Sequence, residues 1–109
     1  MTDEEIFGKL SELRASGTAA CLATIIRTAG STPRETGAKM ILCADGTGYG
    51  SIGGGCGENQ ARSAALRCLL ITKNPELVEV DLTDEMGTRG GDVCGGKVWI
   101  FLEPLGPGQ

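Results

Sequence analysis

The chain of 109 residues contains no histidine. This absence excludes Ser-His and Cys-His catalytic pairs, histidine ligands to a metal, and the commonest general base. Any chemistry must therefore rely on cysteine, acidic, lysine, arginine or tyrosine side chains, or on backbone amides.

The five cysteines form no Cys-x-x-Cys pair, so the sequence lacks a local zinc knuckle. Their odd number and wide spacing fit reduced thiols in a cytoplasmic protein better than a disulfide scaffold. Cys21, Cys43 and Cys68 lie on the apolar faces of expected helices and strands. We expect these three thiols to fill the core, as small buried cysteines commonly do.

Long apolar runs and basic runs are also missing. No apolar stretch approaches the roughly 20 residues that span a bilayer, and the acidic residues 1–5 are unlike a secretory signal. The net charge is −4 and the chain has no run of basic residues, so neither nucleic acid nor an anionic membrane is an expected partner. We therefore expect a cytoplasmic protein.

Hydrophobic residues make up 40% of the chain and charged residues 22%, which is ordinary for a globular domain. The spacing of apolar residues predicts two helices, at about 3–16 after a Thr2-x-x-Glu5 capping box and at about 58–73. About five strands are predicted, at 18–28, 38–43, 48–52, 78–82 and 98–102. We expect Trp99 in the core and Pro104 just beyond the last strand.

These elements predict one domain over residues 1–105, followed by a tail or linker at 106–109. The expected fold is α/β, with α+β as the alternative: a single mixed sheet of about five strands covered by about two helices. A segment of about fourteen residues, 83–96, has no periodicity, and loops of that length in compact domains are usually functional.

The 18 glycines are the compositional outlier, and they cluster. The strongest cluster is Gly50-Ser51-Ile52-Gly53-Gly54-Gly55-Cys56-Gly57-Glu58, which joins a predicted strand to a predicted helix. Backbone amides at such a turn, together with a helix N-terminus, can bind phosphate or carboxylate. The alternative is a tight turn without a ligand, although a plain turn needs only one or two glycines.

Two cysteines lie in glycine-rich loops. Cys56 precedes a helix N-terminus, which lowers a thiol pKa and favours a nucleophile or soft-metal ligand. Neighbouring Glu58 opposes that shift, and a nearby Arg34 would restore it. Cys94, followed by Gly95 and Gly96, lies in a similar loop and is the second candidate metal ligand. The alternative is that both thiols are small apolar fillers.

Arg27, Arg34 and Lys39 form a third candidate group. A guanidinium at Arg34, in a loop that Pro33 stiffens, could grip a phosphate through two hydrogen bonds. The alternative is a solvated charge or a salt bridge to a residue such as Glu35.

Taken in order, several motifs resemble the XdhC/CoxI family. They are Arg27-Thr28-Ala29-Gly30-Ser31-Thr32-Pro33-Arg34, Gly37-Ala38-Lys39-Met40, Asp45-Gly46, the glycine turn at 50–58, Val93-Cys94-Gly95-Gly96 and Phe101-Leu102-Glu103-Pro104-Leu105. The similarity covers about residues 20–105, which correspond to that family's N-terminal domain. A second, Rossmann-like domain that many members carry is absent from this sequence.

The resemblance implies an accessory protein that binds molybdenum cofactor (molybdopterin) transiently and assists its sulfuration and its insertion into a molybdenum hydroxylase such as xanthine dehydrogenase. It implies a cysteine desulfurase as a second partner, and we also expect a homo-oligomer. The candidate cofactor contacts, assigned from chemistry, are Arg34, Ser51, Gly53, Gly54, Gly55, Cys56, Glu58, Cys94, Gly95 and Gly96, with Cys56 and Cys94 as metal ligands and no catalytic residue.

Two other hypotheses remain open at this point. In one, the chain is an enzyme in which Cys56 or Cys94 carries sulfur as a persulfide, or in which the glycine turn holds a nucleotide. In the other, the chain is a docking module without a ligand of its own.

Overall fold

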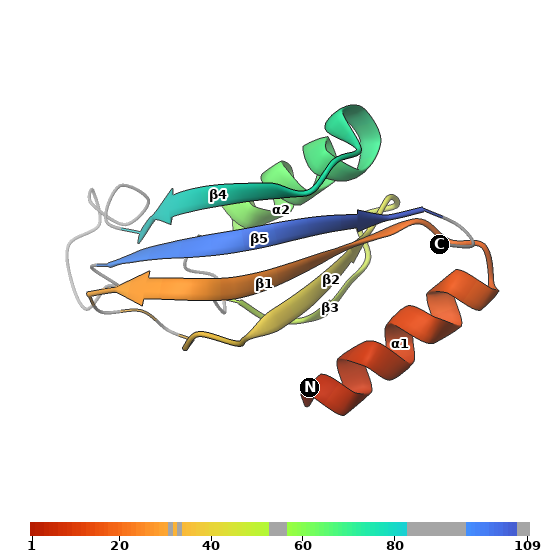
Figure 1. Ribbon diagram of the computed structural model, residues 1–109, viewed down its shortest axis with the longest axis horizontal. Helices are drawn as coiled ribbons and strands as arrows, with labels where there is room; N and C mark the ends of the chain where they lie inside the picture. Colours follow the sequence, from red (N-terminus) through yellow and green to blue (C-terminus); the bar gives the residue numbers. More distant parts are fainter. Residues whose placement is uncertain (31, 33, 53–56, 83–95, 107–109) are drawn as a thin grey trace.

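The computed structural model describes residues 1–30, 32, 34–52, 57–82 and 96–106. Along the chain, α1 (Asp3–Ala15) is followed by the strands β1 (Ala20–Ala29), β2 (Lys39–Cys43) and β3 (Gly48–Gly50). The helix α2 (Glu58–Arg67) continues as a π-helical turn, η1 (Cys68–Thr72), before β4 (Glu76–Asp81) and β5 (Lys97–Leu105). Figure 1 shows the strands as one sheet with a helix on either side.

The sheet has the order β3-β2-β1-β5-β4, and each pairing between described strands is antiparallel. The prediction of one sheet of about five strands with two helices is therefore confirmed. The antiparallel direction of the strands corresponds to the α+β alternative. Hairpins alone do not produce this order, because β5 inserts between β1 and β4.

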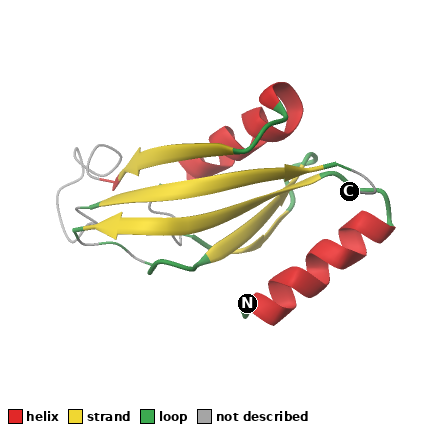
Figure 2. Cartoon of the chain, in the orientation of Figure 1, coloured by secondary structure: helices red, strands yellow, loops and turns green. Residues whose placement is uncertain are grey.

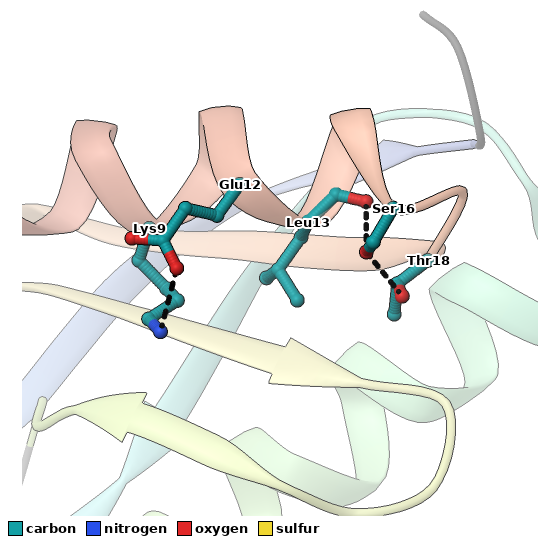
Figure 3. A network of polar contacts seen from close by, with 5 residues as sticks. All are labelled: Lys9, Glu12, Leu13, Ser16 and Thr18. Atoms are coloured by element: carbon teal, nitrogen blue, oxygen red, sulfur yellow. Dashed lines mark hydrogen bonds and ion pairs between the residues drawn. The ribbon is translucent and has the colours of Figure 1, made fainter.

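Helix α1 begins and ends at the residues that the sequence indicated. Thr2 donates its backbone N–H to Glu5 Oε1 at 2.8 Å and accepts from the Glu5 N–H at 3.2 Å, which completes the predicted capping box. At the other end, Ser16 Oγ donates to the Leu13 carbonyl at 3.0 Å and shares a hydrogen bond with Thr18 (Figure 3). These contacts satisfy backbone groups that a helix terminus leaves without partners.

The two faces of the sheet carry separate apolar clusters. Side chains from β1, β2, β4 and β5 pack with α2 on one face, in a cluster that includes Cys21, Ile25, Ala61, Cys68 and Ile100. On the other face α1 (the red helix next to the label N in Figure 2) contributes Ile6 and Leu10 to a smaller cluster. The expectation that Cys21, Cys43 and Cys68 are core residues is confirmed, since all three are free and buried.

Two expectations about the last strand are wrong. Trp99 is only partly buried, because the buried residues of β5 alternate as Val98, Ile100 and Leu102 and leave Trp99 on the opposite face. Pro104 lies inside β5, not beyond it. Proline is tolerated there because β4 pairs with β5 no further than Leu102. On the β4 side of Pro104 there is therefore no strand that would need a backbone N–H from this residue.

Candidate functional site

The ends of the strands gather the three candidate loops at one end of the sheet. Ala29, the last residue of β1, pairs with Lys97, the first residue of β5, and Lys97 pairs with Asp81, the last residue of β4. Next to them, β2 begins and β3 ends, with Met40 opposite Gly50. The segments after β1, after β3 and between β4 and β5 therefore leave the sheet at the same end, on the left in Figure 1.

Gly57, at the end of the glycine turn, packs against residues at the end of β4. It is the N-cap of α2 with φ 71°, and no side chain caps this helix. A Cβ at this position would collide with Leu82 Cδ2 and lie 3.1 Å from Val80 Cγ1. Leu82 in turn donates its backbone N–H to the Gly96 carbonyl at 2.9 Å. Gly57 and Gly96 thus both contact Leu82, so the segments that carry Cys56 and Cys94 start from adjacent points.

The other predicted members of these two segments, Gly53, Gly54, Gly55, Cys56, Cys94 and Gly95, lie outside the described residues. That the two thiols share one site stays a prediction. So does their role as metal ligands, since the part of the chain that the structure describes contains no cluster of three or more cysteine and acidic side chains suited to a metal ion.

The two flanks of the glycine turn are joined by polar contacts. Ser51 Oγ donates to Glu58 Oε2 at 3.4 Å, and Glu58 Oε1 lies 4.0 Å from Arg62 Nε. Arg62 also donates from Nη1 to the Gly46 carbonyl at 3.0 Å. The Glu58 carboxylate therefore connects Ser51, before the glycine turn, with Arg62 of α2. Sequence reasoning selected Ser51 and Glu58 but missed Arg62, for which the four-residue spacing from Glu58 was the available signal.

Arg34 lines a polar cavity of about 440 Å³ between the N-terminus of α1 and the segment that precedes β2. The cavity is lined by Met1, Asp3 and residues 34–39. Lys39 Nζ lies there 3.1 Å from Asp3 Oδ2 and donates to the Gly37 carbonyl at 3.0 Å. Within the described segments, no ion pair joins the exposed Arg34 guanidinium to an acidic side chain.

The predicted group of Arg27, Arg34 and Lys39 is thus divided. Arg34 and Lys39 line the same cavity, whereas the Arg27 guanidinium lies over the Trp99 ring, 4.6 Å from its centroid. The cavity and the glycine turn adjoin, because a Cβ at Gly50 would lie 2.7 Å from the Lys39 carbonyl oxygen. The role of Asp3 was not predicted, since 36 residues separate it from Lys39 and no local pattern connects them.

Two of the buried thiols, Cys21 and Cys43, are poor nucleophiles. Burial, reinforced by the neighbouring Cys68 thiol, raises the pKa of Cys21 to about 12. Burial also raises the pKa of Cys43, and its neighbour Asp45 adds to the shift. Because the thiolate is the reactive form, these core cysteines are unsuited to chemistry at neutral pH. The candidates for a reactive thiol are therefore the loop residues Cys56 and Cys94.

No helix within the described ranges is long and apolar enough to cross a membrane. The fold and the site together define a small antiparallel α+β domain in which the ends of glycine-rich loops, a polar cavity lined by Arg34 and a helix N-terminus without a side-chain cap lie at one end of the sheet.

The chain belongs to the XdhC and CoxI family, whose model matches residues 13–81. It is 32% identical over 101 residues to the uncharacterised Escherichia coli protein YqeB, covering 93% of this chain and 18% of YqeB. A solved Bacillus halodurans chain described as a xanthine dehydrogenase is also 32% identical, with a TM-score of 0.78. That match covers 95% of this chain and 30% of the Bacillus chain, so this chain spans less than a third of either relative.

Proposed function

We propose that this chain acts as an accessory protein that binds molybdenum cofactor and assists its sulfuration and its insertion into a molybdenum hydroxylase such as xanthine dehydrogenase. Membership of the XdhC and CoxI family supports this proposal. The similarity to a Bacillus halodurans chain described as a xanthine dehydrogenase supports the same connection.

The observation that carries the proposal is the contact of Gly57 and Gly96 with Leu82, beside the end of the sheet that also holds Arg34. Three segments far apart in the sequence supply different chemistry to that end. Arg34 offers a guanidinium, the N-terminus of α2 offers backbone amides without a side-chain cap, and the loops carry thiols. The described ends of these segments lie at the same end of the sheet, which supports a shared site.

The residues present suit the different parts of the cofactor. Arg34 and the amides at the start of α2 suit its phosphate, since a guanidinium and a helix N-terminus both bind oxyanions. Gly53, Gly54, Gly55, Gly95 and Gly96 lack a Cβ, so backbone can approach the pterin closely. The cofactor itself supplies a soft molybdenum–sulfur centre, for which the thiols of Cys56 and Cys94 are suitable ligands.

Ser51 and Glu58 have a supporting role in this proposal. Their hydrogen bond joins the two flanks of the glycine turn, from Ser51 to the first residue of α2. No step requires a general base, which agrees with a chain that has no histidine. The partners would be the hydroxylase that receives the cofactor and a cysteine desulfurase that supplies sulfur.

The test is a binding titration of the purified 109-residue chain with freshly released molybdenum cofactor. Arg34→Ala and Cys56→Ser are each expected to weaken binding by about tenfold, the loss for one charge-assisted contact or one ligand. The matched control is Arg14→Ala, because Arg14 is an exposed arginine in the last turn of α1, outside the cavity.

The outcomes separate the three hypotheses. Weaker binding in both variants but not in Arg14→Ala supports the cofactor-binding accessory protein. Unchanged affinity of Cys56→Ser, with loss of sulfur transfer from a desulfurase, would instead indicate a persulfide carrier. A folded native chain that binds the hydroxylase but no cofactor would overturn the proposal in favour of a docking module.

A further inference from the structure

Part of one face of the sheet has no helix packed over it among the described residues. Helix α1 packs on β2 and on the first part of β1, where its cluster includes Leu22 and Ile41. Figure 1 shows α1 beside β2 and β3, on the side of the sheet away from β4. The remainder of this face, which we call the Trp99 face, consists of Ile26, Arg27, Leu77, Glu79, Trp99 and Phe101.

The Trp99 face exposes apolar side chains on a regular element. Ile26 is 47% exposed and Leu77 is 56% exposed, and Trp99 and Phe101 are only partly buried. The register of β1 against β5 shifts between Ile25 and Arg27, so Ile26 is an extra residue at a bulge. Contiguous exposed apolar groups within a polar rim are typical of interaction surfaces.

The charges on this face have a definite order. Arg27, Trp99 and Glu79 occupy one row across β1, β5 and β4, because Arg27 pairs with Trp99 and Trp99 pairs with Glu79. The row therefore reads cation, aromatic ring, anion. Arg27 lies over the ring, and Glu79 lies 3.4 Å from Lys97 Nζ on β5.

This order is complementary to itself under one symmetry operation. A two-fold axis parallel to β5, passing between two facing sheets at Trp99, places β1 of one copy over β4 of the other. Arg27 of each copy then meets Glu79 of the other, and the two Trp99 rings meet at the centre. An axis perpendicular to the strands would place Arg27 over Arg27, so the charges select the first arrangement.

Lys97 and Phe101 lie on β5 and so fall close to the proposed axis. The two Lys97 side chains would approach each other, but each is paired with Glu79 of its own copy, which offsets the repulsion. Face-to-face packing of two sheets with nearly aligned strands is a common arrangement with a spacing of roughly 10 Å. Phe101 would add apolar area on the α1 side of the contact.

We propose that the Trp99 face packs against the same face of a second copy of this chain, with each Arg27 paired to Glu79 of the other copy. Such isologous contacts are the commonest way in which identical chains associate. The proposal is independent of the cofactor, because the Trp99 face lies outside the cavity that Arg34 lines.

The test measures the mass of the full chain by sedimentation equilibrium over a range of concentrations. We expect a monomer–dimer equilibrium, and a blue shift of tryptophan emission with the same midpoint, because Trp99 is the single tryptophan of the chain. Arg27→Glu and Glu79→Arg should each weaken the dimer by more than about tenfold. The reason is that the two-fold symmetric dimer contains two Arg27–Glu79 pairs, and each variant turns both into like-charge pairs. The double variant should recover most of the affinity.

A second pair of variants separates this face from general stickiness. Leu77→Ser should weaken the dimer, whereas Ile71→Ser should not, although Ile71 is 72% exposed, because it belongs to η1 on the opposite side of the sheet. Circular dichroism and thermal unfolding establish that each variant folds. A chain that stays monomeric at all concentrations would overturn the proposal, as would a dimer that the double variant fails to restore.

Discussion

Gly57 shows how much one residue without a side chain can determine in this fold. Its φ of 71° is strained for any residue with a Cβ, and the space where a Cβ would lie is occupied by Leu82. The same contact brings the start of α2 against the end of β4. The position therefore requires glycine for two reasons, conformation and close packing.

We expect Gly57→Ala to lower the free energy of unfolding by about 3 kcal/mol, from the left-handed backbone and from overpacking together. Gly17→Ala is the matched control, since Gly17 has φ 77° with no atom within 4 Å of its Cβ position. Gly17→Ala should lower the free energy of unfolding by about 1 kcal/mol, from the left-handed backbone conformation alone. Urea unfolding of both variants measures the difference, and equal losses would show that Leu82 makes room without cost.

Residue-level patterns in the sequence predicted the core cysteines correctly but placed Trp99 wrongly. The run Val98-Trp99-Ile100-Phe101-Leu102 is apolar throughout, so it contains no alternation from which the two faces could be distinguished. Only the pairing with β1 and β4 determines that Val98, Ile100 and Leu102 face α2. Arg27 was likewise separated from Arg34 by tertiary structure, because it extends over Trp99.

At the scale of elements, α1 is the cover of the smaller apolar cluster. Leu10 is 8% exposed and packs there with Cys43, whereas Cys21 and Cys68 lie under α2 on the other face. Opening of α1 alone would therefore expose one thiol of the three. Helices held by a small buried face are the elements expected to open before the whole domain unfolds.

Leu10→Ala should weaken the packing of α1 by about 2–3 kcal/mol. Because about 1.4 kcal/mol corresponds to tenfold in an equilibrium, alkylation of Cys43 should accelerate more than tenfold. Phe7→Ala, on the same helix but 49% exposed, should change the rate by less than about threefold. Peptide mapping by mass spectrometry distinguishes Cys43 from the other cysteines. Equal acceleration at Cys21 would mean that the domain opens as one unit.

Element boundaries followed the sequence wherever a local chemical signal marks them. The Thr2–Glu5 capping box opens α1, and the helix predicted for residues 58–73 appears as α2 followed by η1, with Lys73 as its left-handed C-cap. The end of β5 could not be predicted from Pro104. Proline blocks a strand only where its missing N–H faces a neighbouring strand, and β4 does not extend that far.

At the scale of the whole molecule, the strand order places the predicted loops together. The sequence indicated each loop separately, through its glycines, its thiol or its arginine. It did not indicate that β5 inserts beside β1, which brings Gly96 next to Gly57 through Leu82. The cavity between Asp3 and Lys39 has the same origin, since it depends on where α1 docks on β2.

The division of the molecule into two ends leads to a prediction that contains its own control. If the cofactor binds at the loop end, hydrogen exchange should slow in residues 34–39, 50–52 and 57–60 when molybdenum cofactor is added. At the opposite end, the turn at 73–76 should exchange at unchanged rates, because its hydrogen bonds are made within η1 and the turn itself. Binding with no affinity for the unfolded chain also raises stability, by about 2.7 kcal/mol at a hundredfold excess over Kd. Exchange rates that slow equally at both ends would reflect only this global stabilisation. Slowing confined to the end of the sheet that holds the turn at 73–76 would place the ligand elsewhere and contradict the site.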